Sequence, residues 1–405
     1  MLTAQKKANS VLFASTLSFT TCFMVWMIFS VAGMPIKDEF NLNPTQFGLL
    51  TAMPVLTGSL CRMPLGMLTD KYGGKIVMFL LMILCVPAVF LLKYANNYYH
   101  FLLISLWLGL VGGSFSVGTP YVAKWFDKKR QGMAMGIFGA GVSGTAVNLF
   151  IAPFIISAYG WRALPVVYAA ILLVVAVIFW CCSFTNKAHL VTSQTSLWDQ
   201  IKLIKDKNVL KYSQYYTVVF GGYVGISLWM VNYYVEEYHL NLTQAALIAT
   251  CFSLPGGVLR AMGGWLSDKF GAHRVTWSIM WVCWVAFFLL SYPQTQMTIQ
   301  TIHGPSEFYI GLNVYVFSAI LFVVAIALAI GQASVFKYIA NDFPENIGTV
   351  SGIVGLAGGI GGFLLPILFG ALTDITGIRS SSFMLMYGTV CVSLIWMHFS
   401  FRKNN

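Results

Sequence analysis

Charged residues are scarce in this sequence of 405 residues: Asp, Glu, Lys and Arg make up only 9% of it, whereas hydrophobic residues make up 58%. Soluble domains carry roughly 25% charged residues, so the composition excludes an ordinary soluble protein. A helix needs about 20 predominantly apolar residues to cross a bilayer. The sequence predicts an all-α membrane protein with twelve transmembrane helices, near residues 11–35, 46–68, 76–94, 99–122, 132–156, 162–183, 211–235, 243–267, 275–292, 310–337, 347–372 and 380–400.

The sequence also lacks the residue patterns of metal sites, disulfide frameworks and enzymes. None of its eight cysteines has metal-ligand or disulfide spacing in a loop. No nucleophile lies with a base in a recognisable cluster. We therefore expect no metal, no cofactor and no enzymatic activity. We interpret the cysteines as packing residues because all lie within predicted spans, at Cys22, Cys61, Cys85, Cys181, Cys182, Cys251, Cys283 and Cys391.

Positive charge is in excess, and it is distributed unevenly. The net charge is +11, from 24 Lys and Arg against 13 Asp and Glu. Eighteen of the 24 basic residues fall on one side of the predicted membrane, four fall on the other, and the remaining two are Arg62 and Arg260. Basic residues gather on the cytoplasmic side of membrane proteins. The charge therefore indicates a topology with both termini in the cytoplasm, and not a nucleic-acid partner.

Acidic residues are missing from the middle of the predicted spans, where two arginines lie. All 13 acids map to loops or span ends. Arg62 precedes Asp70, at a span end, by eight residues, or about 12 Å of helix. This places Arg62 near the midplane of a hydrocarbon core about 30 Å thick, and the same holds for Arg260. An arginine there costs about 2.5–3.5 kcal/mol to insert.

An uncompensated arginine pair requires a counter-charge. We expect it to be an anionic substrate bound between the two guanidinium groups; the alternative is a pair of structural arginines bonded to carbonyl groups. Nitrate, nitrite and carboxylates present two coplanar oxygens that match the planar guanidinium fork.

The two arginines belong to an internal repeat with an offset of 198 residues. The repeat predicts two six-helix halves related by a parallel pseudo-two-fold axis, at 1–186 and 211–405, with the substrate at midplane between them. An amphipathic linker at 187–210 is predicted to lie on the cytoplasmic face. Each arginine precedes a short motif, made of Gly66, Asp70, Lys71 and Gly73 in the first half and Gly264, Asp268, Lys269 and Gly271 in the second.

The acids of these motifs lie at helix ends. There Asp70 and Asp268 can pair with a neighbouring base or a helix N-terminus. Such a contact can hold two helices together in one state of a transport cycle and break in the other, which is a gating role.

The motifs resemble the cytoplasmic signature of the major facilitator superfamily. The stretch Pro54-x3-Gly58-x3-Arg62-x-Pro64-x-Gly66 is similar to helix 2 of its nitrate/nitrite porter family. The stretch Gly348-x3-Gly352-x2-Gly355-x2-Gly358-Gly359 is similar to helix 11 of that family. The resemblance covers nearly the whole chain. It implies the major facilitator fold in a multi-pass protein of the bacterial inner membrane, acting as a monomer in nitrate transport and assimilation.

The same resemblance implies where the anion binds. It assigns the anion to Arg62 and Arg260 and flanking aromatic rings to Phe115, Tyr216 and Phe220. The glycine-rich segments of helices 5 and 11 leave room for an anion against the backbone, with Gly141, Ser143, Gly358 and Gly359 as candidate contacts.

One residue departs from the family pattern. Val142 stands where the family usually has Asn, and Asn148 lies about 240° further round the helix. The departure leaves the identity of the anion open.

These observations favour exchange of nitrate against nitrite by rocking of the two halves. No acid or histidine in a span offers a proton carrier, and an empty pair of arginines opposes closure of the halves. Proton-coupled nitrate symport, known in the family, stays an alternative, since anion uptake against the membrane potential requires coupling. A carrier of another small anion, such as a short carboxylate, and a non-transporting sensor are further alternatives. The expected partners are nitrate, nitrite and the lipid bilayer.

Overall fold

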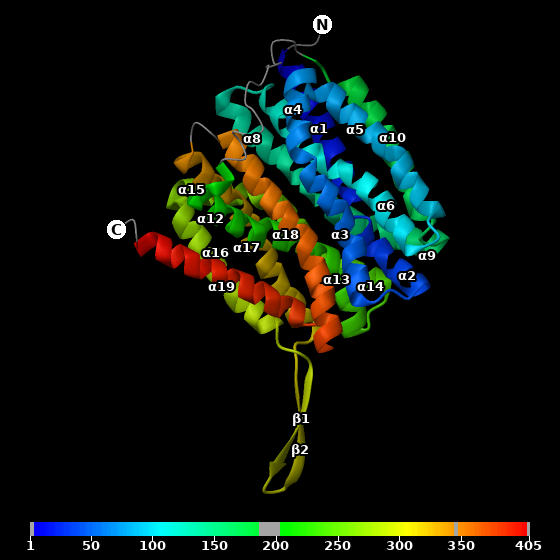
Figure 1. Ribbon diagram of the computed structural model, residues 1–405, viewed down its shortest axis with the longest axis vertical. Coiled ribbons are helices and arrows are strands. Elements are labelled where there is room, and N and C mark those ends of the chain that lie inside the picture. Colours follow the sequence, from blue (N-terminus) through cyan, green and yellow to red (C-terminus); the bar gives the residue numbers. More distant parts are fainter. Residues whose placement is uncertain (1–3, 186–202, 344–346, 403–405) are drawn as a thin grey trace.

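The structure is a computed structural model that describes residues 4–185, 203–343 and 347–402. The N-terminal helices, drawn from blue to green, form one body, and the C-terminal helices, drawn from green to red, form a second (Figure 1). The first body contains α1 (Ala4–Trp26), α2 (Phe29–Phe40), α3 (Pro44–Leu60), α4 (Arg62–Tyr72), α5 (Gly74–Leu91), α6 (Tyr98–Leu108), α7 (Ser114–Ala123), α8 (Lys128–Gly139), α9 (Gly144–Tyr159) and α10 (Ala163–Cys182).

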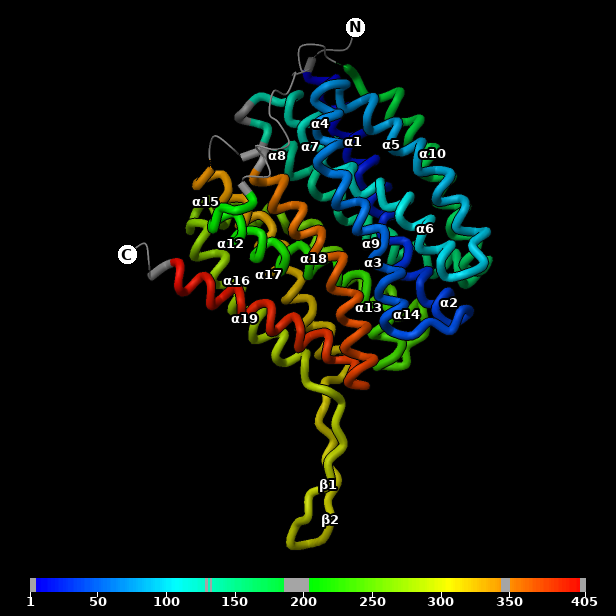
Figure 2. Tube along the Cα trace, viewed as in Figure 1, coloured from blue at the N-terminus to red at the C-terminus, as the bar shows by residue number. Residues whose placement is uncertain are grey.

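The second body contains the remaining helices of the described chain. These are α12 (Lys207–Tyr216), α13 (Gly222–Tyr238), α14 (Leu242–Val258), α15 (Arg260–Phe270), α16 (Ala272–Leu290), α17 (Val314–Asp342), α18 (Ile347–Thr376) and α19 (Ser381–Arg402). The two bodies meet along α3 and α18, which run side by side through the middle of the tube trace (Figure 2).

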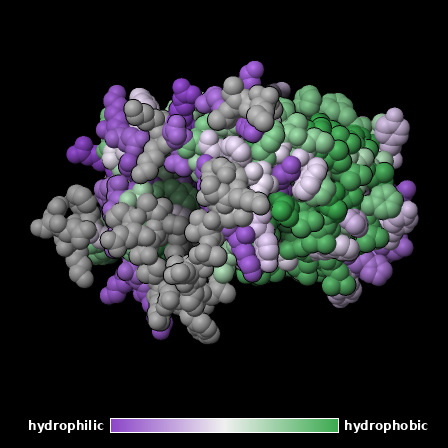
Figure 3. All heavy atoms as spheres, turned by 90° about the horizontal axis from the view of Figure 1, so that it is seen from above, coloured by the Kyte–Doolittle hydropathy of each residue, from purple (hydrophilic) through white to green (hydrophobic). Residues whose placement is uncertain are grey.

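All twelve predicted spans coincide with helical stretches. Among the described residues, ten stretches are long and apolar enough to cross a membrane, and α14 with α15 forms an eleventh that is bent by 46°. The predicted span 46–68 corresponds to α3 and α4, which meet at Cys61. Seen from above, a hydrophobic band lies between two hydrophilic margins (Figure 3), as expected for a surface that faces lipid.

Several spans are interrupted by short turns of another helix type. The 3-10 helix η2 (Gly109–Gly113) joins α6 to α7, and η3 (Ala140–Ser143) joins α8 to α9. The π-helical turn η6 (Thr217–Gly221) joins α12 to α13. Irregular backbone at membrane depth is tolerated where it is buried in protein or lines a cavity.

One segment outside the predicted spans forms strands instead of a helix. Strands β1 (Thr295–Thr301) and β2 (Gly304–Ile310) form an antiparallel hairpin in the predicted loop between spans nine and ten, with Met297 opposite Phe308. Polar and apolar residues alternate along β1, which is the two-residue period of a strand. The hairpin projects from one end of the bundle (Figure 1), and we refer to that end as the hairpin end.

The predicted linker at 187–210 falls mostly outside the described residues. Its described part contains the 3-10 turn η5 (Leu203–Lys205) and the first turn of α12. The Asp206 side chain accepts hydrogen bonds from the backbone N–H groups of Asn208 and Val209, which caps α12. The first span of the C-terminal half therefore begins at Lys207, four residues before its predicted start at residue 211.

At the hairpin end the two halves are joined by polar contacts. Lys37 of α2 lies 2.7 Å from Glu236 of α13, and Arg379 lies 3.4 Å from the second oxygen of Glu236. The Asp374 carboxylate of α18 accepts a hydrogen bond of 2.9 Å from the backbone N–H of Thr45, at the start of α3. We call Lys37, Glu236, Thr45 and Asp374 the latch.

Close backbone packing accompanies the latch. A Cβ atom on Gly48 of α3 would lie 2.2 Å from the carbonyl oxygen of Pro366 in α18, so only glycine permits this approach. Among the described residues, the ion pairs at the opposite end lie within one half: Asp70 pairs with Lys124, and Asp268 with Lys337. In the described chain, the ion pair that joins the two halves therefore lies at the hairpin end.

Candidate functional site

Both midspan arginines lie at breaks in their helices. Arg62 is the first residue of α4, directly after Cys61, and Arg260 is the first residue of α15, directly after Leu259. In the first copy, Pro64 has no N–H to donate to the carbonyl of Leu60, which interrupts the helical hydrogen bonding. In the second copy, the N–H of Met262 donates to the carbonyl of Leu259 across a tight turn. The internal repeat therefore extends to the backbone geometry around each arginine.

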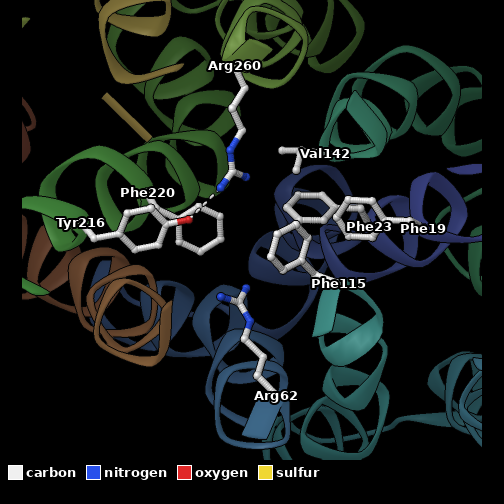
Figure 4. Close-up of a pocket in the computed structure, with 8 residues that line it drawn as sticks. All are labelled: Phe19, Phe23, Arg62, Phe115, Val142, Tyr216, Phe220 and Arg260. Carbon is white, nitrogen blue, oxygen red and sulfur yellow. Dashed lines mark hydrogen bonds between the residues drawn. The ribbon is translucent and has the colours of Figure 1, made fainter. Parts of the chain in front are cut away.

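The two guanidinium groups face one another across one cavity between the halves (Figure 4). The unfilled space in and beside the cavity is about 220 Å³, which includes space open to solvent. The enclosed part is small, with about 10 Å³ of room for the centre of a water-sized molecule, so the site suits a small ion and not a drug-sized ligand. Its lining consists of Phe19, Phe23, Arg62, Phe115 and Val142 from the N-terminal half and Tyr216, Phe220 and Arg260 from the C-terminal half.

Most of the lining residues lie close to a helix interruption. Phe115 follows η2, Val142 belongs to η3, and Phe220 belongs to η6. With Tyr216 at the end of α12 and the breaks before Arg62 and Arg260, six of the eight lining positions occur where regular helix stops or resumes. The irregular turns of the spans thus converge on the cavity.

Arg62 reaches across to the other half of the molecule. Its Nη1 donates a hydrogen bond of 3.1 Å to the carbonyl oxygen of Gly355 in α18. Its guanidinium carbon lies 5.0 Å from the ring centre of Phe220, within the range of a cation–π contact. Its Nε is buried and has no partner among the described residues. The group therefore retains N–H donors for an anion.

Arg260 makes the reciprocal contacts. Its Nη2 donates to the hydroxyl of Tyr216 at 3.1 Å. Its guanidinium carbon lies 5.6 Å from the ring centre of Phe115, in the opposite half, and 5.8 Å from that of Phe336. Neither arginine forms a salt bridge with an acid of the described chain. Within the described chain the arginine pair therefore lacks a carboxylate, and one carbonyl group bonds Arg62.

The model of the Major Facilitator Superfamily matches residues 14–241 and 215–404. The chain is 35% identical to the probable nitrate/nitrite antiporter NarK1 of Thermus thermophilus, over 97% of this chain and 91% of that protein. It is 31% identical to the nitrite extrusion protein of Bacillus subtilis strain 168, over 96% of this chain and 94% of that protein. The chain belongs to the nitrate/nitrite porter family of the major facilitator superfamily.

Solved structures agree with this assignment at the level of the fold. A bacterial homolog of the human lysosomal transporter Spinster superposes on the porter with a TM-score of 0.73 at 16% identity, covering 97% of each chain. The likeness confirms the major facilitator fold that the sequence predicts.

The motifs of the porter form the expected ion pairs. Asp70 lies 2.8 Å from Lys124, at the end of α7, and Asp268 lies 2.6 Å from Lys337, in α17. Gly73 and Gly271 end α4 and α15 with φ angles of +88° and +85°, a conformation that favours glycine. Among the other motif residues, a Cβ on Gly66 or Gly264 would meet nothing within 4 Å, Lys71 lies over the Tyr72 ring, and Lys269 lies over Trp265 and Phe270.

The small residues proposed as anion contacts lie behind the cavity lining. A Cβ on Gly141 would lie 2.4 Å from the Phe19 ring, and one on Gly358 would lie 2.4 Å from the Tyr216 ring. A Cβ on Gly359 would lie 2.0 Å from Ser59 of α3. Ser143 packs through its backbone against Gly257. In this conformation these residues let helices and rings approach closely.

The sequence analysis did not identify two phenylalanine rings of the cavity lining or a third phenylalanine that packs on Tyr216. Phe19 and Phe23 form part of the apolar wall opposite Tyr216 (Figure 4). Phe336 packs edge-to-face on Tyr216 at 5.0 Å between ring centres. The four-residue spacing from Phe19 to Phe23 places both rings on one helical face, but the chain contains 31 Phe, so this spacing alone does not single them out.

Proposed function

We propose that this chain is a secondary transporter that exchanges nitrate against nitrite across the bacterial inner membrane, as a monomer with both termini in the cytoplasm. One observation carries the proposal: two arginines, one from each half, face each other across a small cavity without a carboxylate. The names of two relatives, a probable nitrate/nitrite antiporter and a nitrite extrusion protein, support the same substrates.

The cavity offers few hydrogen-bonding groups besides the arginines. The hydroxyl of Tyr216 is the third, and the other lining residues are Phe19, Phe23, Phe115, Val142 and Phe220. A flat monoanion of four or fewer heavy atoms can place its oxygens toward both guanidinium forks and its faces against aromatic rings. Larger or more highly charged anions would require more donors and more space than this cavity provides.

Alternating access follows from the placement of the arginines on opposite halves. We propose that residues 1–186 and 211–405 rock about the site as two bodies. Without an anion, closing the halves brings two positive charges together in a medium of low dielectric constant, which is unfavourable. A bound monoanion offsets that repulsion, so the halves close and reorient mainly when loaded. Such a carrier exchanges anions.

We expect the purified protein in proteoliposomes to take up nitrate without a pH gradient when the vesicles contain nitrite. Vesicles that contain no anion of this class should take up little nitrate, because the empty carrier returns slowly. Labelled nitrate uptake measures the rate. Uptake that requires a pH gradient would replace the exchange mechanism with proton symport, and faster exchange of formate than of nitrate would indicate a carboxylate carrier.

A substitution in the latch is expected to change the relative populations of two conformations, one open at the hairpin end and one open at the opposite end. Glu236→Gln removes the charge that holds Lys37, whose side chain is only 12% exposed. The conformation closed at the hairpin end then loses stability, and the state open at that end becomes more populated. Because apparent affinity scales with the fraction of binding-competent protein, we expect the KM for nitrate added on that side to fall several-fold.

The matched control for the latch is Glu39→Gln. Glu39 pairs with Arg162 at 2.7 Å, and both residues belong to the N-terminal half. This variant should leave the KM values on both sides unchanged. Equal KM values for the parent and Glu236→Gln would show that the latch does not control access.

A further inference from the structure

The π-helical turn η6 lies between the two aromatic residues that support the arginines. Tyr216 ends α12 directly before η6, and Phe220 lies within it. Their rings stack at 5.2 Å between centres, with an angle of 7° between planes. Tyr216 contacts Arg260 through its hydroxyl, and Phe220 contacts Arg62 through its ring. The geometry of one helical turn therefore sets the surroundings of both arginines.

A π-helical turn inside an α-helix requires support, because its backbone departs from the regular pattern of hydrogen bonds. The support comes from α17. Gln332 is fully buried, and its Nε2 donates a hydrogen bond of 3.3 Å to the carbonyl oxygen of Val219, in the middle of η6. A Cβ on the adjacent Gly331 would lie 2.5 Å from the Val219 side chain. Glycine there lets α17 approach η6 closely enough for this bond.

A second hydrogen bond holds the same turn from α18. The Thr217 hydroxyl donates to the carbonyl oxygen of Ala357 at 3.3 Å. Gln332 also lies one helical turn before Phe336, whose ring packs on Tyr216 and beneath Arg260. The face of α17 that carries Gln332 and Phe336 is thus turned toward the anion site.

We propose that Gln332 is a positioning residue of the anion site: it holds the π-helical turn that orients Tyr216 toward Arg260 and Phe220 toward Arg62. Gln332 does not line the cavity, so it acts through these two aromatic residues. The proposal rests on the proposed function of nitrate and nitrite exchange. It assigns to α17 a role in affinity that the cavity lining alone does not reveal.

The test compares three single variants in nitrate/nitrite exchange by proteoliposomes. Gln332→Met keeps the size of the side chain and removes the donor. Thr217→Val keeps the shape and removes the second hydrogen bond to the turn. We expect both to raise the KM for nitrate, the first by about tenfold, as for the loss of one buried hydrogen bond, with little change in maximal rate. The matched control is Ser334→Ala, in the same helix, because its buried hydroxyl bonds Thr276 of α16 and the Gly331 carbonyl of its own helix, and not a residue of η6.

A double-mutant cycle with Tyr216→Phe distinguishes positioning from a general loss of stability. If Gln332 acts through Tyr216, Gln332→Met should raise KM less in the Tyr216→Phe background than in the parent, since coupled residues are not additive. A KM for both Gln332→Met and Thr217→Val equal to that of Ser334→Ala would overturn the proposal. A parent protein that exchanges no nitrate would instead overturn the proposed function, so the two failures are distinguishable.

Discussion

Replacement of either Arg62 or Arg260 by lysine is expected to lower the affinity for nitrate by about 100-fold. The ammonium keeps the charge but cannot bind two coplanar oxygens, and it loses the stacking that the planar guanidinium makes. A hydrogen bond to a charged group contributes about 1.5–3 kcal/mol, and a cation–π contact contributes about 0.5–2 kcal/mol. Since each 1.4 kcal/mol is about tenfold in affinity, losses of this size lower the affinity for nitrate by about 100-fold.

The pseudo-symmetry of the site makes this prediction specific. Each arginine begins a helix segment, and each lies over an aromatic ring of the opposite half, Phe220 for Arg62 and Phe115 for Arg260. The two substitutions should therefore reduce affinity by similar factors. Isothermal titration with nitrate, nitrite, formate and chloride measures them. Arg162→Lys, at an exposed pair with Glu39, is the control, and binding by both midspan variants equal to that of the parent would remove the site from this cavity.

A carboxylate introduced at Val142 is expected to abolish nitrate exchange. The Val142 side chain faces the cavity beside the Arg260 guanidinium (Figure 4). In Val142→Asp the carboxylate becomes a permanent counter-ion and competes with the substrate. Two unit charges about 4 Å apart attract by about 4 kcal/mol at an effective dielectric constant of about 20. We therefore expect an affinity for nitrate lower by at least about 100-fold.

The amide Val142→Asn supplies the matched control, because it has the shape of the aspartate without its charge. It should keep nitrate affinity within about tenfold of the parent, since a neutral side chain changes hydrogen bonding by only about 0.5–1.5 kcal/mol. The ratio between the two variants, measured by the same titration and by exchange in proteoliposomes, isolates the electrostatic contribution. If Val142→Asp bound nitrate as well as Val142→Asn, the anion would not occupy this cavity.

The sequence predicted the arginine pair because a charge within an apolar span is visible in a single chain. The offset of 198 residues between Arg62 and Arg260 then predicted one site between two halves, and the structure brings both residues to one cavity. The ion pairs of Asp70 and Asp268 followed from the same repeat. Such residues can be singled out from sequence because charge in a membrane span is rare and its placement is energetically constrained.

The apolar part of the site was less accessible to sequence reasoning. Phe115, Tyr216 and Phe220 came from the family resemblance, and Phe19 escaped notice because phenylalanine in a span is equally suited to lipid, core and cavity. Gly358 was expected to contact the anion, and the structure instead places it behind the Tyr216 ring. A glycine in a sequence predicts close approach, but it does not identify which group approaches.

The irregular backbone could not be read from hydrophobic patterns. A span is predicted from the mean hydropathy of a window, which is the same for a straight helix, a broken helix and a π-helical turn. The hairpin at residues 295–310 escaped for a related reason: its Ile302–His303 turn lacks the Asn-Gly or Asp-Gly signal of tight hairpins.

The helix breaks have a consequence for how far the arginines move during transport. Helix α4 has 11 residues, so it is about 16 Å long. A tilt of about 10° around its first residue displaces its far end by about 3 Å, yet Arg62 stays almost in place. Because α15 begins at Arg260 in the same way, bending at the two breaks can widen or narrow the end of the bundle that carries Asp70 and Asp268 with little displacement of either arginine. This bending adds to the rocking of the two halves, which sets the separation of the guanidinium groups.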